Sequence, residues 1–395
     1  MKKTLIALAL STVPLAALAD VTLYGEIKGG LEYSARSHLN NTVTNVNDWG
    51  SYLGFKGEED LGNGLKAIWQ IEQSVSLDTD SYRNIGWANR DSFIGLSGDF
   101  GTLRVGYLSD SFRKGLKTID EDWEGNGVRT LAHLSQFDKR YTGVRYDSPE
   151  WSGFKFNVFY SPEDNQRFNE ARLSDPDYVA DSLSTNNDGF SGMIGSLNYN
   201  TGYRDILSVG LGYENAGWFA KYAYKNLKRN APSFSYEEGK EAKPLNGEVH
   251  GVEFGYNDGT IFAGVGYRNS RNIVAGGNGF YASNWQTNDA AVTFAYTAGN
   301  IVPRISLAYG EEKERHVANP TKNKYSQLIA GVDYNLSKRT TVLASLGYWT
   351  NKPKTWVEVR DQTTDVFRKE EDKRYQRRKD RLEDYSIGLG IRHKF

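Results

Sequence analysis

The sequence has no cysteine, only two methionines and only nine prolines in 395 residues. Without thiols the protein has no disulfide bonds and no thiolate metal ligands, which is compatible with an oxidising compartment. Beyond the N-terminal segment, no stretch reaches the roughly 18 consecutive apolar residues that predict a membrane-spanning helix. The charges nearly cancel, at a formal net charge of -1, and this balance does not point to a nucleic-acid partner.

The N-terminus has the pattern of a cleavable export signal. Two lysines precede an apolar run from Leu5 to Leu18, which ends in Ala-Leu-Ala before Asp20. A charged start, an apolar middle and small residues at the end are typical of a secretory signal, and the run is shorter than the roughly 20 residues of a spanning helix. We therefore expect residues 1–19 to be a signal peptide and residues 20–395 to form the mature protein.

A short alternating segment that ends in a small residue and a tyrosine recurs along the chain. Alternate positions are apolar, while the positions between them contain many Gly, Ser, Lys and Glu residues, too polar for the dry core of a soluble sandwich. A tyrosine ring is apolar and its hydroxyl group is polar, so the end of such a strand suits a membrane interface. The repeat ends at Tyr213, Tyr256, Tyr267, Tyr296, Tyr309, Tyr334 and Tyr348.

The alternation predicts an all-β protein, a closed antiparallel transmembrane β-barrel that forms a single domain. Short links rich in turn-forming residues alternate with long polar links, as expected when turns lie at one rim and loops at the other. A further alternating segment, 191–199, is assigned to a hairpin within the fourth long loop. The sixteen predicted strands are residues 21–33, 51–58, 65–75, 90–97, 102–108, 141–147, 154–161, 206–214, 218–227, 248–257, 260–269, 289–297, 302–311, 325–335, 340–351 and 385–395.

The first predicted strand shows why we expect a barrel in lipid. Leu23 and Ile27 point to one side, and Glu26 and Lys28 point to the other. In hydrocarbon every strand amide also needs a partner, so the sheet must close by pairing its first strand with its last. The expected partner is the terminal alternating segment, which stops on Phe395.

Five segments resemble a known family. In chain order they are DVTLYGEIKGGLE (20–32), GFKGEEDLGNGLKAIWQIEQ (54–73), RDSFIGLSGDFGTLRVG (90–106), VRYDSPEWSGFKFNVFYSP (144–162) and SIGLGIRHKF (386–395). In their order and spacing the chain resembles the general porins of Gram-negative bacteria, nearest the neisserial type, over essentially the whole mature length. The resemblance implies an outer-membrane trimer of sixteen-stranded barrels, in each of which the third long loop folds inward and narrows the pore.

The resemblance also implies that acids of the third loop face a ladder of basic residues on the wall. The loop from Ser109 to Arg140 contains a run of acids, and lumen-facing positions of the predicted strands contain basic residues. Arg90 and Arg145 match the family motifs best. The predicted constriction consists of the acids Asp120, Glu121, Asp122 and Glu124 and the bases Lys28, Lys56, Lys66, Arg90, Arg104 and Arg145.

These features predict a water-filled general diffusion channel for ions and small hydrophilic solutes, with no catalysis and no cofactor. Opposed charges across a narrow pore create a transverse field that favours polar solutes. Tyr52 and Tyr107 stand where relatives often have a basic residue, which weakens the case for anion preference. The acidic run also has basic neighbours, namely Arg113, Lys114, Lys117 and Arg129.

Two other functions fit parts of the sequence. A substrate-specific channel for sugars or anions would use aromatic side chains, and Trp49, Trp87 and Trp123 lie in or near predicted loops, where they also suit loop packing. An outer-membrane hydrolase would need a serine beside a histidine. No serine motif accompanies the five histidines, of which His250 and His393 fall on outward positions near strand ends.

Two charged loops bear on ligands and partners. The acids of the third loop offer the oxygen ligands that calcium prefers, but an acidic loop is more often hydrated or ion-paired, and no metal site is predicted. The final loop, 352–384, has a basic side that could hold lipopolysaccharide phosphate, although its interspersed charges favour a solvated loop. The expected partners are two further copies of the chain, outer-membrane lipid including lipopolysaccharide, and the ions and small solutes that pass through.

Overall fold

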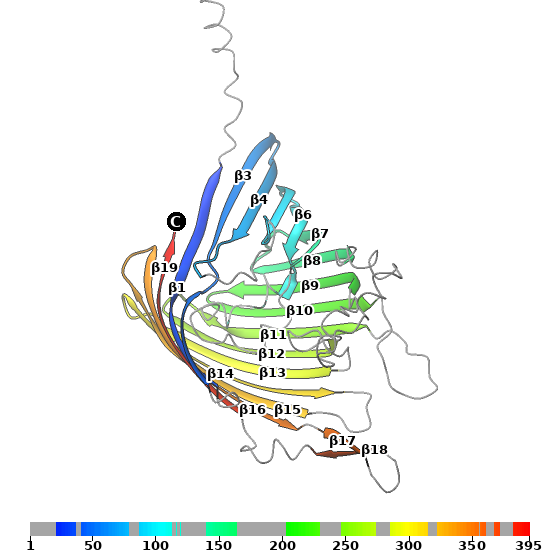
Figure 1. The fold of residues 1–395 in the computed structure, drawn as a ribbon. Coiled ribbons are helices and arrows are strands. Elements are labelled where there is room, and N and C mark those ends of the chain that lie inside the picture. The colour runs from blue at the N-terminus through cyan, green and yellow to red at the C-terminus, as the bar shows by residue number, and fades with distance from the viewer. Residues whose placement is uncertain are drawn as a thin grey trace, which may run out of the picture.

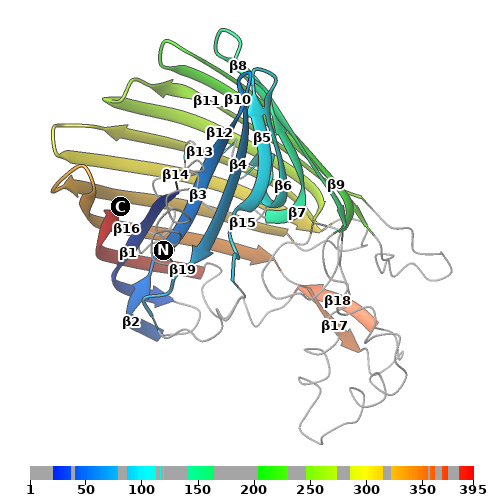
Figure 2. The same ribbon diagram turned by 90° about the horizontal axis from the view of Figure 1, so that it is seen from above.

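The protein forms a closed barrel of antiparallel strands, shown in two orientations in Figure 1 and Figure 2. The structure is a computed structural model, and it describes residues 21–36, 41–78, 87–112, 116, 119, 140–163, 203–229, 246–273, 285–314, 322–354, 356–360, 367–371 and 382–395. Within these ranges, no helix has the length and apolar character needed to cross a membrane.

The strands vary in length around the barrel. In chain order they are β1 (Thr22–Arg36), β2 (Asn41–Asp48), β3 (Tyr52–Gly62), β4 (Leu65–Ser74), β5 (Ser92–Gly98), β6 (Gly101–Ser109), β7 (Arg140–Asp147), β8 (Phe154–Glu163), β9 (Tyr203–Asn215), β10 (Trp218–Arg229), β11 (Gly247–Asn257), β12 (Ile261–Ile273), β13 (Trp285–Tyr296), β14 (Ile301–Glu314), β15 (Lys322–Asn335), β16 (Thr340–Lys354), β17 (Trp356–Arg360), β18 (Phe367–Glu371) and β19 (Leu382–Lys394). Strands β5 to β8 are the short side of the wall, and β12 to β16 are the tall side.

The second strand of the wall is interrupted. β2 pairs with residues 29–36 of β1, and β3 pairs with residues 22–26 of the same strand. The registers of the two ladders differ by one residue, so residues 49–51 form a bulge within one continuous wall position. The seventeen strands of the main sheet therefore occupy sixteen wall positions, as predicted. The predicted range for this strand, 51–58, was wrong because it omitted β2.

The barrel closes where the first and last strands meet. β1 pairs with β19 over Glu26–Arg36, and β19 pairs with β16 on its other side. At the end of the seam, the amide of Phe395 donates to the carbonyl of Gly25 at 3.2 Å, and the amide of Gly25 donates back at 3.3 Å. Each wall strand therefore has a hydrogen-bonded neighbour on both sides, which is the condition for a sheet in hydrocarbon.

The predicted short links all occur as tight connections at one rim. The turn between β11 and β12 shows how the sequence specifies them. Gly259 has a φ of +85°, a conformation that glycine adopts without strain. The carboxylate of Asp258 accepts hydrogen bonds from the amides of Ile261 at 2.7 Å and Thr260 at 2.8 Å, and these bonds lower the pKa of Asp258.

Four other features of the chain differ in how well the sequence predicted them. The choice of residues 206–214 as the eighth wall strand is confirmed, because β9 pairs with β8 and β10. The segment 191–199 lies outside the described residues. Arg90 precedes β5 instead of beginning it, and the β17–β18 hairpin, a two-stranded sheet of its own, was missed in a stretch without clear alternation.

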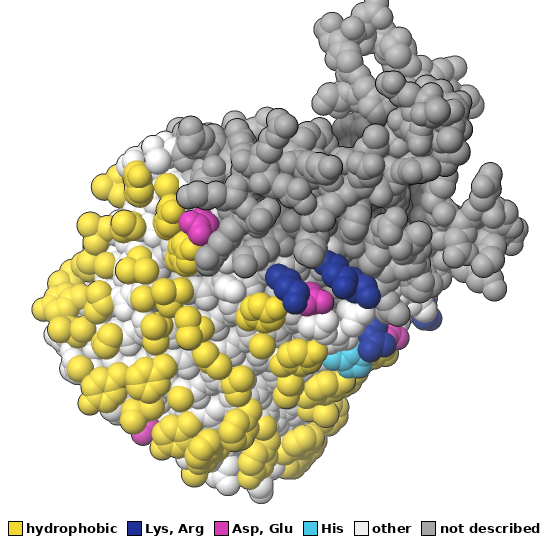
Figure 3. All heavy atoms as spheres, turned by 90° about the horizontal axis from the view of Figure 1, so that it is seen from below, with side chains coloured by type: hydrophobic (Ala, Val, Ile, Leu, Met, Phe, Trp, Pro, Cys, Tyr) yellow, Lys and Arg dark blue, Asp and Glu magenta, His cyan; other side chains and the backbone are white. Residues whose placement is uncertain are grey.

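The two faces of the wall differ as predicted. Leu23 of β1 and Leu389 of β19 point outward and are 54% and 56% exposed, whereas Glu26 and Lys28 on the inner face of β1 are buried. Figure 3 shows a broad outer surface of hydrophobic side chains with few charged groups. An apolar surface of this extent suits hydrocarbon and not water.

Trp49, which we expected near a loop, lies on the inner face of the wall. Trp49, in the bulge between β2 and β3, is 5% exposed. Its ring lies over Gly30 of β1 and Gly390 of β19, where a Cβ atom would collide with it. The two glycines therefore make room for a tryptophan that covers the seam from the inside.

We predict that Leu389→Arg lowers the free energy of unfolding by about 2–4 kcal/mol, the cost of a basic side chain near the middle of the bilayer on the lipid face. Denaturant titration of the protein folded into phospholipid vesicles measures this cost. Ser386→Arg, on the inner face of the same strand, is the control and should cost less. Equal effects of the two substitutions would show that the outer face does not contact lipid.

Deletion of Phe395 should reduce the yield of folded barrel, because it removes both terminal hydrogen bonds to Gly25 at the seam. The ring also packs on Gly25, where a Cβ atom would come within 2.7 Å of it. The fraction of heat-modifiable protein on electrophoresis reports the yield, with Phe395→Trp as a control that keeps an aromatic end. Normal assembly of the shortened chain would contradict the importance of this closure.

Candidate functional site in the barrel interior

The predicted basic residues of the first three wall positions lie on the inner face and contact partners on the wall. The ammonium group of Lys28 lies 3.2 Å from the carboxylate of Glu26. The ammonium group of Lys56 lies 5.2 Å from the centre of the Tyr24 ring. Lys66 pairs with a carboxylate of β3, Glu58, at 2.6 Å, and both side chains remain about half exposed. The partners of Lys56 and Lys66 lie on neighbouring strands, and the partner of Lys28 lies on its own strand.

Arg90 joins the loop before β5 to the wall. Its Nε donates to Glu72 on β4 at 2.5 Å, and its guanidinium lies 4.3 Å from the centre of the Tyr52 ring. The other oxygen of Glu72 accepts a hydrogen bond from Tyr24 at 3.0 Å. The ring of Tyr52 therefore makes a cation–π contact with the guanidinium of Arg90, and this contact orients the positive charge.

Arg140, the first residue of β7, extends this cluster and was not predicted. Its Nε donates to Asp91 at 2.9 Å, and its guanidinium approaches Glu72 at 3.9 Å. Asp91 also accepts hydrogen bonds from the amide and hydroxyl groups of Ser109, where the third loop begins. The cluster therefore connects the wall to the base of the third loop.

Arg104 and Arg145 lie opposite each other on β6 and β7 and share one carboxylate, Asp147. Arg145 is 3% exposed, and it also donates to the carbonyl of Ser109 at 3.1 Å. The guanidinium of Arg104 lies 5.3 Å from the centre of the Phe93 ring. Two neighbouring arginines against one acid leave a local surplus of positive charge.

The same arrangement occurs at other points around the described wall. Each carboxylate is shared by two basic side chains, and all but one of these eight side chains lie on the strand of the acid or on an adjacent strand. The groups are Glu26 with Lys28 and Lys394, Asp147 with Arg104 and Arg145, Glu214 with Lys155 and Lys221, and Asp333 with Arg304 and Arg392. In each group one carboxylate holds two basic side chains at fixed positions. Its single negative charge can neutralise only one of their two positive charges.

The third loop starts inside the barrel. Asp110 is fully buried and pairs with Lys225 of β10. The amide of Ser111 donates to Ser208 of β9 at 3.2 Å, and its hydroxyl group donates to Asn157 of β8 at 2.5 Å. These contacts bring the beginning of the loop from β6 across the inner face of the next strands.

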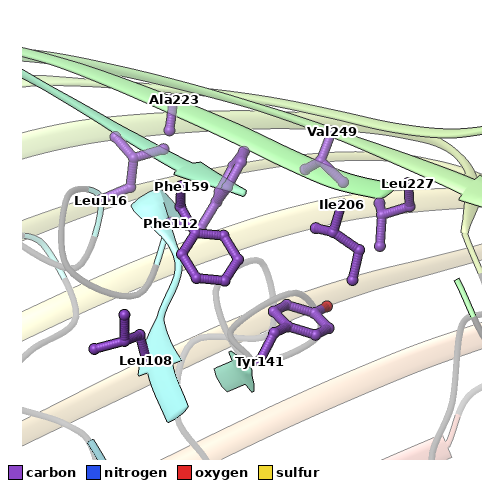
Figure 4. Packing of buried hydrophobic residues seen from close by; sticks show 9 residues of the cluster. All are labelled: Leu108, Phe112, Leu116, Tyr141, Phe159, Ile206, Ala223, Leu227 and Val249. Carbon is purple, nitrogen blue, oxygen red and sulfur yellow. The ribbon is translucent and has the colours of Figure 1, made fainter. Parts of the chain in front are cut away.

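The described residues farther along the loop continue on this path. Figure 4 shows Phe112 and Leu116 close to the inner side chains of β9, β10 and β11. Leu116 covers Gly251 of β11, and Ile119 covers Gly264 of β12. The hydroxyl group of Thr293 on β13 donates to the carbonyl of Ile119 at 2.6 Å. The described part of the third loop therefore lies against the inner wall as far as β13. The predicted acids, Asp120, Glu121, Asp122 and Glu124, lie outside the described residues.

Basic side chains also surround a cavity of about 260 Å³ at the short-turn end of β7 to β10. Arg145, Lys155 and Lys221 contribute to its lining, together with Asp147. Gly210 and Gly212 also line it, next to the side chains of Asn157 and Lys155. With three basic side chains and one acid in its lining, the cavity offers an excess of cationic groups.

Alternation along the strands could have identified the inner basic residues that we did not predict. Lys225, Arg268 and Arg304 occupy inward positions of β10, β12 and β14, and all three are buried. The guanidinium of Arg268 lies 4.9 Å from the centre of the Phe112 ring. The family motifs are densest in the first seven strands and the last, and these three residues lie between them.

No metal centre emerges from the residues that the structure describes. They contain no group of three or more His, Asp or Glu side chains placed to hold a metal ion. His250 contacts the hydroxyl group of Tyr222 at 2.9 Å, and His393 contacts that of Thr340 at 2.9 Å. Both contacts lie at exposed positions near strand ends, as the sequence predicted.

Comparisons with known solved structures show the same fold. An anion-selective porin from Comamonas acidovorans superposes with a TM-score of 0.64 at 19% identity, covering 95% of this chain and 99% of the other. OmpF of Salmonella typhi superposes with a TM-score of 0.58 at 15% identity, covering 95% and 97%.

Sequence relatives are closer. Major outer membrane protein P.IB of Neisseria lactamica is 38% identical over 360 residues, which cover 88% of this chain and 93% of that protein. Protein P.IA of Neisseria meningitidis serogroup C is 36% identical over 389 residues, which cover 89% and 95%. The sequence model of the Gram-negative porins matches residues 4–354. The chain therefore belongs to the Gram-negative porin family, and it is a diffusion channel of the outer membrane.

Proposed function

We propose that the charged interior forms a constriction which gives this general diffusion porin a modest preference for anions. The supporting observation is that four carboxylates of the inner wall are each shared by two basic side chains. Each group keeps one positive charge that its own acid does not neutralise. Fixed cations of this kind raise the local concentration of anions within about one Debye length, roughly 8 Å at physiological salt.

In this proposal the third loop narrows the channel and sets the direction of the field. The ion-paired arginines Arg90, Arg104, Arg140 and Arg145 stand on the short side of the wall, and the loop leaves from Ser109 beside them. The predicted acids, Asp120 to Glu124, would face these arginines across the remaining opening. A field between the two sides orders water and favours polar solutes over apolar solutes of the same size.

Two features of the relatives support further parts of the proposal. The solved porin of Comamonas acidovorans is described as anion-selective, and OmpT, an outer membrane protein of Vibrio cholerae with the same fold, is described in a trimer form. We propose that this chain also assembles as a homotrimer, after removal of residues 1–19 as a signal peptide. Lipid of the outer membrane then surrounds the apolar outer face.

The alternative functions have weaker support. A hydrolase would need a nucleophile beside a histidine, and the hydrogen bonds of His250 and His393 are to Tyr222 and Thr340 at the ends of strands. A sugar-specific channel would need aromatic rings open to the pore, but the ring of Trp49 is packed on wall glycines. We therefore propose passive transport without a chemical step or a cofactor.

We predict that replacing Arg90 and Arg145 by glutamine shifts the reversal potential in a salt gradient toward cation preference. Asp147→Asn should shift it in the opposite direction, because both arginines at that site lose their shared anion. Both shifts should fade near 1 M salt, where the Debye length is only about 3 Å. Single-channel recordings on the folded variants measure the effect. If neither variant differs from the parent protein at low salt, these residues do not set the selectivity.

Displacing the third loop should widen the channel. At Gly264 a Cβ atom would come within 2.6 Å of Ile119, so Gly264→Val should push the loop away from the wall. We expect a higher single-channel conductance and a larger size limit for neutral solutes. Gly212→Val is the control, because a Cβ atom there meets only the Lys155 side chain at 3.5 Å. A channel of unchanged conductance in Gly264→Val would contradict a constriction formed by this loop.

A further inference from the structure

The four groups of shared carboxylates all lie near one rim of the barrel, the rim of the short turns. Apart from Glu26 and Lys28, each member is among the four residues nearest that end of its strand, within about 13 Å along the strand. Glu26 stands opposite Lys394, the last residue of β19. We call the twelve side chains of these groups the basic belt. Its eight bases and four acids have a net formal charge of +4.

Acids in the neighbouring short turns do not cancel the charge of the belt. Asp99 and Asp258 are at exposed positions in these turns, where water and salt screen them. Side chains of the belt face the interior, and two of them, Arg145 and Arg304, are only 3% and 5% exposed. Charges that are partly buried are screened much less, so the belt acts more strongly on ions within the channel.

At the other end of the described inner wall, next to the long loops, each base has an acid beside it. Three of these bases form ion pairs, and the fourth stands directly opposite an acid in the register of β12 and β13. This end therefore has no excess of positive charge among the described pairs. The pairs are Arg90 with Glu72, Arg140 with Asp91, Lys225 with Asp110 and Arg268 with Asp289.

The two ends also differ in the charge that lines their cavities. A cavity of about 70 Å³ lies near the long loops, and its lining includes Glu32 of β1, Asp384 of β19 and Trp349 of β16. Among the described residues of this lining there is no base. The cavity near the short turns is lined by three bases and one acid. The charge of the described inner wall therefore changes along the barrel axis, from positive near the short turns to neutral or negative near the long loops.

We propose that this axial asymmetry makes the channel rectify ionic current. The channel conducts better when the long-loop side, which faces the exterior, is electrically positive, so that anions leave the periplasm and cations enter it. Fixed cations raise the local anion concentration within about one Debye length, so anions carry most of the current through the belt. Ions of both signs carry the current through the rest of the channel.

The direction of the rectification follows from the order of these two zones. With the exterior positive, the belt delivers anions faster than the rest of the channel removes them, and cations arrive from the other side. Salt accumulates where the zones meet, and the conductance rises. The opposite voltage depletes salt at the same place and lowers the conductance. The inference rests on the same charged groups as the proposed anion preference, but it depends on where they lie along the axis.

The test records single channels with equal salt of about 0.1 M on both sides, before any slow closure. The variant Asn300→Cys, in the exposed turn between β13 and β14, marks the periplasmic mouth. Biotin on this cysteine binds streptavidin from one chamber only, which reports the orientation. We expect currents at equal and opposite voltages to differ roughly 1.5-fold at low salt. The ratio should approach 1 near 1 M salt, where the Debye length is about 3 Å.

Two variants at one group of the belt should change the ratio in opposite directions. Lys155→Gln with Lys221→Gln should lower it toward 1, because Glu214 then lacks both bases. Glu214→Gln should raise it, because both lysines lose their shared acid. The matched control is Lys313→Gln with Lys322→Gln, which removes two positive charges from facing, exposed positions of β14 and β15. These lysines lie on the outer face, so the control should rectify as the parent protein does.

Equal currents at the two polarities in low salt would overturn the inference, and so would a larger current with the exterior negative. An unchanged ratio in both variants of the Glu214 group, or an equal loss in the control, would also overturn it. In equal salt the reversal potential is zero whatever the ion preference. A channel that prefers anions in a salt gradient but conducts equally in both directions would therefore reject this inference and leave the proposed function intact.

Discussion

Every backbone amide and carbonyl group within the hydrocarbon layer must find a partner in the protein, and this requirement fixes the architecture. The wall meets it by closing, with β1 between β19 on one side and β2 and β3 on the other. Closure in turn fixes the register of each strand. Because side chains alternate between the two faces, the register decides which residues meet lipid and which meet the interior.

Because side chains alternate between the two faces, charged side chains of the wall face the interior. There they form ion pairs in which one acid contacts two basic groups. A buried charge is tolerated when it is paired and hydrogen-bonded, and the partners of Glu72 and Asp147 come from β1, β6 and β7 and from Arg90 before β5. Side chains of the same clusters, Asp91 and Arg145, bind Ser109, where the third loop begins. The electrostatics of the channel and the path of the loop therefore depend on the same side chains.

Much of this arrangement was predictable from the sequence, because the alternation of apolar residues with Lys28, Arg104 and Arg145 has the period of a strand. The number of wall strands, the short turns and the orientation of these residues followed from that pattern. β2 was missed because the bulge at Trp49 shifts the register by one residue, and Arg140 was missed because its partners, Glu72 and Asp91, are distant in sequence. Pairing between distant residues depends on the closed register, which a single sequence pattern does not specify.

The absence of cysteine allows a direct test of the two-faced wall, since any cysteine introduced is the only thiol. Single cysteines at residues 66 to 71 of β4 should react with a charged, membrane-impermeant thiol reagent at the even positions and reduce the current through the channel. The odd positions should react only with a lipid-soluble reagent and leave the current unchanged. Equal reactivity at successive positions, or a period other than two, would contradict a closed barrel with a hydrated interior and a lipid-facing exterior.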